Sequence, residues 1–102
     1  MKKITVTPGY YEWHVCVDNQ IVWTDGDPSE CLFGDDAYTI EEYADLITSF
    51  HRYMQTGQEK VDTDSINWEL LNTLTTDDFD VIKQEYAKAL KQTYDIGSNE
   101  EN

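Results

Sequence analysis

Lysine and arginine are scarce in this sequence. Only 7 of its 102 residues are lysine or arginine, against 21 aspartates and glutamates, and the formal net charge is −14 at pH 7. No lysine or arginine occurs from residue 4 to residue 51, an interval that holds ten acidic residues. Such a surface repels DNA, RNA and anionic membranes. We therefore expect no direct binding to nucleic acid or to a membrane.

Long apolar runs and a cysteine framework are also missing. The N-terminal residues, MKKITVTPGYYEW, include no apolar run of about seven residues, so we expect no signal peptide. No segment approaches the ~20 apolar residues that span a membrane. Cys16 and Cys31 are too few for a disulfide framework. The sequence therefore predicts a cytoplasmic protein.

The first quarter of the chain has the pattern of antiparallel strands. The length predicts one domain, residues 1–97, with a flexible acidic tail, residues 98–102. Residues 2–7 and 10–17 alternate in polarity, and residues 21–24 are apolar enough to return as a third strand. Turn-forming residues separate these segments. We expect a three-stranded antiparallel meander.

The rest of the chain has helical spacing. Thr39 and Glu42 have the spacing of a capping box ahead of a helix over residues 40–55, which Gly57 ends. Its expected apolar stripe consists of Ile40, Tyr43, Ala44, Ile47, Phe50, His51 and Met54. Asp64 or Ser65 is expected to cap a short helix through Leu74.

A last helix follows Thr76 and ends near Gly97. Its expected apolar stripe consists of Phe79, Ile82, Tyr86, Ala89, Leu90 and Tyr94. Residues 25–38 are expected to form a loop. The fold class predicted is α+β, a three-stranded antiparallel sheet followed by two or three helices packed on one face.

The sequence motifs give little support for metal binding or catalysis. His14 and Cys16 lack the knuckle spacing of zinc sites. The start of an EF-hand loop at Asp62-x-Asp64 fails because Ile66 occupies the next ligand position. An irregular calcium site within residues 25–36 remains an alternative. No phosphate-binding loop or nucleophile motif is present, so we expect a non-enzymatic protein without a metal or cofactor.

The acidic residues themselves are the main candidate for function. The segment GDDAYTIEEYAD, residues 34–45, holds five carboxylates and no cation. Carboxylates three or four residues apart on a helix lie ~5–6 Å apart, which resembles the spacing of nucleic-acid phosphates. Arginine grips a carboxylate with the same fork geometry that it uses for phosphate. Tyr38 and Tyr43 are expected to pack at the rim and stack on guanidinium groups.

We therefore predict a partner-binding face on residues 25–45, with a secondary patch in the last helix. The predicted contact residues are Asp25, Asp27, Glu30, Asp35, Asp36, Tyr38, Glu41, Glu42, Tyr43, Asp45, Asp77, Asp78 and Asp80. A plain solvated surface is the alternative, because acids in the first turn of a helix are stabilised by the helix dipole and acidic surfaces favour solubility.

In size, net charge and acidic runs such as DDAYTIEEYAD and TTDDFD, the chain resembles the small acidic inhibitors of phages and mobile elements. These include DNA-mimic anti-restriction proteins and anti-CRISPR proteins. The resemblance implies an inhibitor that occupies the nucleic-acid channel of a nuclease, and it assigns no residue roles. It therefore predicts a partner with a basic protein surface.

Two other functions remain open at this point. The first is an accessory protein-interaction domain that uses an aromatic hairpin, with Tyr10, Tyr11, Trp13 and Trp23 as its contact. The second is a calcium-binding module.

Overall fold

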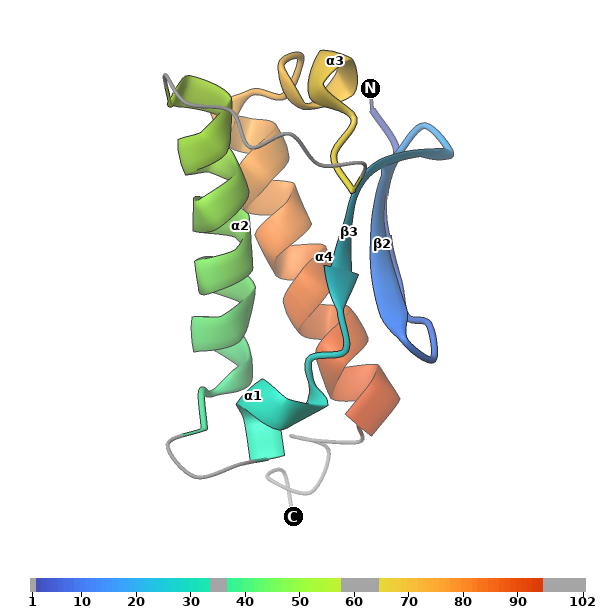
Figure 1. Cartoon of the computed structure of the whole chain (residues 1–102), viewed down its shortest axis with the longest axis vertical. Helices are drawn as coiled ribbons and strands as arrows, with labels where there is room; N and C mark the ends of the chain where they lie inside the picture. The colour runs from blue at the N-terminus through green and yellow to red at the C-terminus, as the bar shows by residue number, and fades with distance from the viewer. Residues whose placement is uncertain (1, 34–36, 58–64, 95–102) are drawn as a thin grey trace.

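The computed structural model describes residues 2–33, 37–57 and 65–94, which form three strands and four helices (Figure 1). The strands are β1 (Ile4–Thr7), β2 (Glu12–Val17) and β3 (Gln20–Gly26). The helices are α1 (Ser29–Phe33), α2 (Ile40–Thr56), α3 (Trp68–Leu71) and α4 (Thr76–Tyr94). This order confirms the predicted α+β class, with an antiparallel sheet ahead of the helices.

The sheet has the strand order β1-β2-β3. Ile4 pairs with Val17, and Val17 pairs with Gln20 across a two-residue turn. The turn residues Asp18 and Asn19 have φ angles of 52° and 69°, as a type I′ hairpin turn requires. Asp and Asn adopt this left-handed region more readily than other non-glycine residues, so this turn joins β2 directly to β3.

A β-bulge lies in β3 opposite the middle of β2. Val15 pairs with Trp23 and Cys16 with Ile21, so Val22 has no partner in β2. Both Val22 and Trp23 are fully buried, although they are consecutive in the strand. The bulge explains this, because strict alternation would have turned one of the two side chains toward solvent.

A short segment covers the outer edge of β3. The amide of Thr24 donates to the carbonyl of Ser65 at 2.9 Å, and the amide of Asn67 donates to the carbonyl of Val22 at 2.7 Å. Ile66 lies opposite Trp23 between these two bonds. The edge of the sheet is therefore paired at this point rather than open to another chain.

Local capping fixes where α2 begins. The Thr39 hydroxyl accepts a hydrogen bond from the amide of Glu42, and the Glu42 carboxylate accepts one from the amide of Thr39. The predicted capping box is thereby confirmed, and Gly57 ends the helix as expected. Thr75 and Asp78 make the same reciprocal pair of bonds at the start of α4. Both long helices therefore begin at a residue that the sequence specifies.

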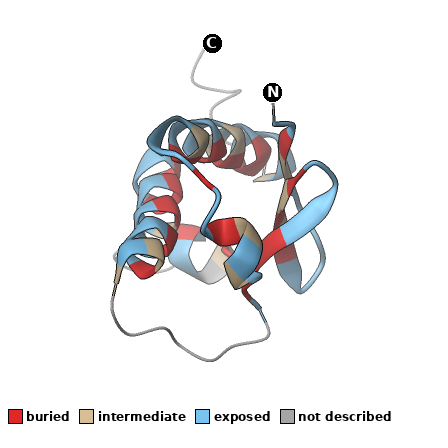
Figure 2. Cartoon of the chain, turned by 90° about the horizontal axis from the view of Figure 1, so that it is seen from above, coloured by how far each residue is buried: buried red, intermediate tan, exposed pale blue. Residues whose placement is uncertain are grey.

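The core lies between the sheet and the two long helices. Trp13, Val15 and Val17 point to one side of β2 and are at most 2% exposed, while Glu12, His14 and Cys16 on the other side are exposed or half-buried. Figure 2 shows the buried residues on the sides of the helices and strands that face one another. α2 and α4 run antiparallel, so their opposite ends meet (Figure 1).

Several predicted boundaries are wrong. Residues 25–38 were expected to be a loop, but β3 extends to Gly26 and α1 begins at Ser29. The helix expected from residue 64 or 65 to Leu74 is only α3, and Asn67 caps it rather than Asp64 or Ser65. The residues 98–102, Asp64 and Gly97 lie outside the described part of the chain. None of the helices in the described ranges has the length and hydropathy needed to cross a membrane.

Candidate functional site

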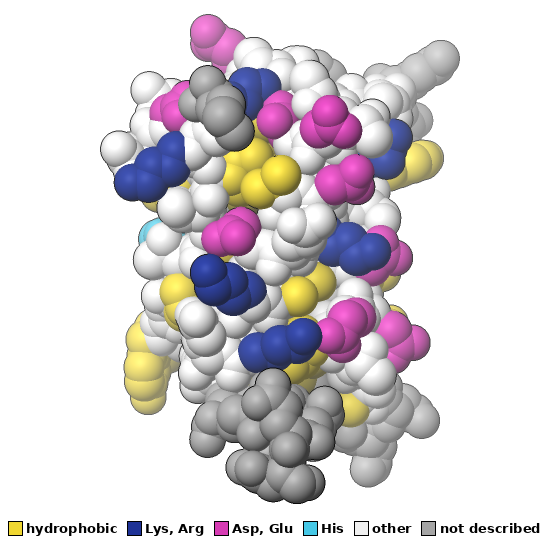
Figure 3. Space-filling model, turned by 180° about the vertical axis from the view of Figure 1, so that it is seen from behind, with side chains coloured by type: hydrophobic (Ala, Val, Ile, Leu, Met, Phe, Trp, Pro, Cys, Tyr) yellow, Lys and Arg dark blue, Asp and Glu magenta, His cyan; other side chains and the backbone are white. Residues whose placement is uncertain are grey.

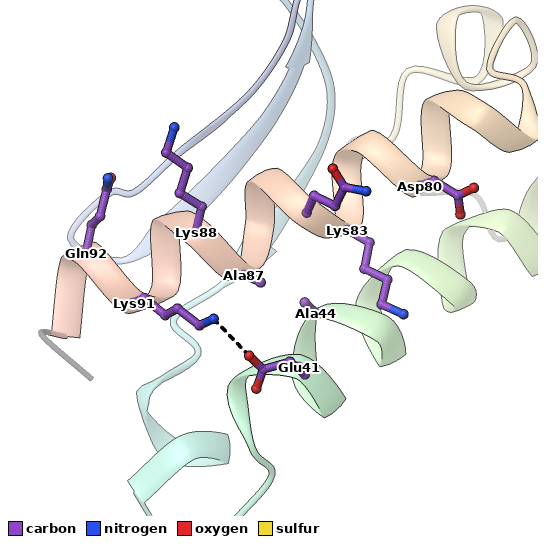
Figure 4. A pocket seen from close by; sticks show the side chains of 9 residues that line it. Glu41, Ala44, Asp80, Lys83, Ala87, Lys88, Lys91 and Gln92 are labelled. Carbon is purple, nitrogen blue, oxygen red and sulfur yellow. Dashed lines mark ion pairs between the residues drawn. The ribbon is translucent and has the colours of Figure 1, made fainter. Parts of the chain in front are cut away.

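Two predicted contact residues on α2 are paired with lysines of α4. Lys91 Nζ lies 2.9 Å from Glu41 Oε1, and Lys83 Nζ lies 3.3 Å from Asp45 Oδ1. Figure 4 shows Lys91 reaching across to Glu41, while Lys88 points away from it. The hydrogen bond from Lys91 lowers the pKa of Glu41. Glu41 and Asp45 therefore have cationic partners within the chain, although their own segment, residues 34–45, holds no cation.

These pairs border a shallow groove between α2 and α4. The groove has a volume of about 630 Å³, and Ala44 and Ala87 are among its apolar lining residues. Figure 3 shows carboxylates interspersed with lysine and arginine side chains on the face that includes this part of the molecule. Exposed ion pairs add little stability, about 0–1 kcal/mol each. Their effect here is to cancel charge that a phosphate mimic would need.

One of the three carboxylates of the predicted secondary patch on α4 is also paired within the chain. Asp78 Oδ2 lies 2.6 Å from Lys2 Nζ and also accepts the amide of Thr75. Burial opposes ionisation of Asp78, but the hydrogen bonds from Lys2 and Thr75 lower its pKa. The carboxylate of Asp78 is thus paired within the chain. Asp77 and Asp80 are exposed, and Asp80 lines the groove between α2 and α4 together with Glu41.

Tyr43 does not lie at a rim. Its side chain is only 5% exposed, and its ring packs edge-on against Tyr86 at a centroid distance of 6.2 Å. Burial raises the pKa of Tyr43. The expectation that it stacks on a partner's guanidinium is wrong, because the ring belongs to the core. Tyr38, the other predicted aromatic contact, is 44% exposed.

Asp25 is half-buried and held by two neutral donors. The indole N–H of Trp23 and the hydroxyl of Tyr86 both donate to its Oδ2 atom at 2.8 Å. His51 stacks on Trp23 at a centroid distance of 3.8 Å, and its Nδ1 lies 2.9 Å from the carbonyl of Ile47. Asp25 is therefore part of an internal network and not one of a row of surface carboxylates.

This network shifts the pKa values of Asp25 and His51. Burial raises the pKa of Asp25, and this outweighs the opposing effects of His51 and the two donors. Burial lowers the pKa of His51, despite the Ile47 carbonyl and the Asp25 charge. Both shifts have the same main cause, because burial disfavours the charged form of each group.

Asp27 precedes α1, and Glu30 lies within it. Asp27 is exposed and accepts hydrogen bonds from the amide and the hydroxyl of Ser29, which lower its pKa, and from the hydroxyl of Tyr94. Burial, the charge of Asp27 and the hydrogen bond to Asp27 raise the pKa of Tyr94 to about 12. Asp35 and Asp36 lie outside the described residues, as does the side chain of Glu30. The described residues contain no group of three or more possible metal ligands.

Comparisons with protein-family models, curated proteins and solved structures found no match.

The solvent-facing side of α2 carries an apolar ridge that the sequence analysis missed. Leu46, Phe50 and Tyr53 are 45%, 53% and 73% exposed. Their spacing of four and then three residues places them in one row along the helix. Phe50 was expected in the core stripe, and that prediction is wrong. The signal was in the sequence: these three residues form a second stripe, rotated away from the buried one.

Carboxylates border this ridge toward the start of α2. Glu42 precedes Leu46 by one helical turn, and Asp45 precedes it by one residue. Both are exposed, although Glu42 also caps the helix and Asp45 contacts Lys83. We call the surface formed by Glu42, Asp45, Leu46, Phe50 and Tyr53 the α2 face. Only Glu42 and Asp45 belong to the predicted contact region, residues 25–45, and the α2 face combines their charge with the exposed apolar area that follows them.

The charge of Asp25 should reduce stability near neutral pH. Its pKa in the folded protein lies above the ordinary value of 3.8, so folding favours the protonated form. The associated stabilisation is present below pH ~3.8 and is lost as pH rises through the folded pKa. Asp25→Asn retains an acceptor for both donors. We expect this variant to be more stable than wild type at pH 7, with the advantage disappearing at acidic pH.

Asp25→Ala provides the contrast, because it leaves the Trp23 and Tyr86 donors without an acceptor. We expect it to lose about 2–4 kcal/mol at pH 7. Urea denaturation of both variants between pH 3.5 and 7.5 measures these effects. If Asp25→Asn and Asp25→Ala destabilise the protein equally at pH 7, the charge of Asp25 itself stabilises the fold.

Proposed function

We propose that this protein is a non-enzymatic inhibitor that binds a basic, nucleic-acid-binding groove of another protein, as found in CRISPR and restriction nucleases. It does so through the α2 face. The observation that carries the proposal is the composition of that face: three exposed apolar side chains in a row, bordered by carboxylates on a chain of net charge −14.

The apolar ridge supports a protein partner. Large apolar side chains gathered on a surface are characteristic of interaction sites. Aromatic side chains are enriched among the residues that dominate binding energy, because they bury a large area at small conformational cost. Phe50 and Tyr53 are one turn apart and supply two such anchors. A helix that presents its apolar row to a groove is a recurrent mode of recognition.

The charge supports a basic partner. Glu42 and Asp45 are exposed near the start of α2, at one end of the ridge, and the α4 carboxylates Asp77 and Asp80 are exposed as well. Carboxylates in these positions meet the lysines and arginines that line a nucleic-acid channel. The net charge steers the approach, whereas the apolar contacts hold the complex once it forms. The internal ion pairs leave the carboxylates in a supporting role, and they move the main contact to the ridge.

A second candidate surface lies at the β1–β2 turn. Tyr10 and Tyr11 are 84% and 80% exposed, and their rings contact each other edge-on at 4.5 Å. These two side chains support the alternative of an aromatic hairpin interface. Trp13 and Trp23, which were expected to share it, are 1% and 0% exposed and belong to the core. The exposed Glu12 follows Tyr11 directly, but an interface dominated by the two aromatic rings would depend less on salt than the α2 face.

Salt dependence separates the two surfaces. The tagged protein is used to recover its partner from lysate of the cells that carry the gene, and the dissociation constant of the purified pair is measured at several salt concentrations. We expect at least a ~10-fold loss of affinity between about 0.1 and 0.5 M salt, because screening removes the steering and pairing of charges. Two results together would contradict the proposed function: a partner that does not bind nucleic acid, and a dissociation constant that does not change with salt.

A further inference from the structure

A pocket between α2 and β3 lies beside the Asp25 network. Its volume is about 290 Å³. Most of its wall is apolar and comes from Ile47, Phe50, Met54 and Ile66. The polar side chains in its lining include Asp25 and His51. A mostly apolar cavity with a few fixed polar groups is the usual form of a small-ligand site, although this one is at the small end of the range.

The carboxylate of Asp25 has one oxygen free for a ligand. Both of its hydrogen bonds, from Trp23 and Tyr86, fall on Oδ2. Oδ1 has no hydrogen-bond donor among the described residues, and Asp25 lines the pocket. The two donors fix the orientation of the carboxylate from the core side. Asp25 thus lines the pocket with a carboxylate that is held by one oxygen and whose other oxygen is available to a donor.

The charge of Asp25 has no cationic partner. The groups that donate to it are an indole and a phenol, which are both neutral. No lysine or arginine of the described residues forms an ion pair with it. His51 is close enough to interact with it, but burial keeps the imidazole neutral at pH 7. A partly buried charge without a partner is unfavourable, and a bound cation would relieve that cost.

The shape of the pocket selects among cations. The apolar walls favour an alkyl stem over a hydrated metal ion, and the described residues offer no cluster of three metal ligands. Phe50 is part of the pocket wall, and aromatic rings attract organic cations. We propose that this pocket binds the head group of a small organic cation, an alkylguanidinium or alkylammonium, with Asp25 Oδ1 as its acceptor. Phe50 belongs both to this pocket and to the α2 face, but the site is tested on the protein alone and does not depend on the proposed function.

Nuclear magnetic resonance titration of the full chain with n-butylguanidinium tests the proposal. The Trp23 indole N–H and the His51 ring report on the site directly, because both belong to the network beside Asp25. We expect saturable shifts of these signals with half-saturation at about 1 mM, as a ligand of this size allows. n-Butanol and butyrate serve as matched probes with the same stem and no positive charge. Equal shifts with n-butanol, or no saturable shift with n-butylguanidinium, would overturn the proposal.

Two variants test which carboxylate binds the cation. Asp25→Asn removes the charge and keeps an acceptor for Trp23 and Tyr86. We expect it to lower the affinity for n-butylguanidinium at least about tenfold. Asp45→Asn removes the same charge from the outside of α2 and should leave the affinity unchanged. Equal loss in both variants would show general attraction to an acidic protein and would overturn the assignment. If Asp25→Asn does not fold, the comparison of n-butylguanidinium with n-butanol in the wild type still decides.

The same titration separates two sources of the cation. n-Butylguanidinium represents a free small molecule, and arginine blocked at both ends represents a basic side chain of a partner protein. Binding of both indicates that the pocket admits a side chain presented on a backbone. Binding of n-butylguanidinium alone indicates a free ligand. Either result supports the site, and failure of both probes overturns it.

Discussion

Trp23→Ala should destabilise the protein by about 4 kcal/mol, the upper range for removing a buried aromatic side chain. Trp23 is 0% exposed, stacks on His51 and donates to Asp25. A domain of this length has a total stability of about 5–15 kcal/mol, so this one change removes a large part of it. We expect the melting temperature to fall by about 20 °C. Urea denaturation with a fluorescence or circular dichroism signal measures the loss.

Trp23→Phe and Tyr10→Ala are the matched controls. Trp23→Phe keeps most of the ring volume and removes the donor to Asp25, so we expect a smaller loss of about 1–2 kcal/mol. Tyr10 is 84% exposed, and its removal should change stability by less than about 0.5 kcal/mol. A loss below about 1 kcal/mol for Trp23→Ala would show that β3 and α2 are not packed as described.

Phe50→Ala combined with Tyr53→Ala should weaken partner binding more than 100-fold. The two rings are the largest apolar groups on the α2 face, and central aromatic anchors contribute about 2 kcal/mol or more each when truncated. Both side chains are more than half exposed, so the free energy of unfolding should change by less than about 0.5 kcal/mol. Isothermal titration calorimetry with the purified partner, alongside a thermal melt, separates the two effects.

Tyr10→Ala combined with Tyr11→Ala is the matched control for that experiment. It also removes two exposed aromatic rings, but from the β1–β2 turn rather than from α2. Under the proposed function this variant binds like wild type. The reverse pattern, with the tyrosine pair essential and the α2 pair dispensable, would assign the interface to the hairpin.

Much of the fold follows from local sequence signals. The strands alternate in polarity, Asp18 and Asn19 supply a turn with positive φ, and Thr39 with Glu42 begins α2. Each of these features depends on residues that are close in the sequence. The bulge in β3 depends instead on pairing with β2, so the sequence did not indicate that Val22 and Trp23 would both be buried.

The candidate site was less predictable, because long-range neighbours decide what a carboxylate does. Glu41 and Lys91 are fifty residues apart and meet only because α2 and α4 pack antiparallel. Asp25 looks like a loop residue in DGDPSE, yet it lies at the end of β3 and binds Tyr86 of α4. Charge counting along the chain finds acidic residues but cannot say which of them are already paired.

Displacement of nucleic acid from the partner tests the central claim most directly. A fluorescent DNA or RNA substrate is bound to the recovered partner, and its anisotropy is followed as the protein is added. The proposed function predicts release of the substrate at about one equivalent of wild-type protein, and retention with the Phe50→Ala, Tyr53→Ala variant. A stable ternary complex, in which the partner holds both the protein and its substrate, would contradict it.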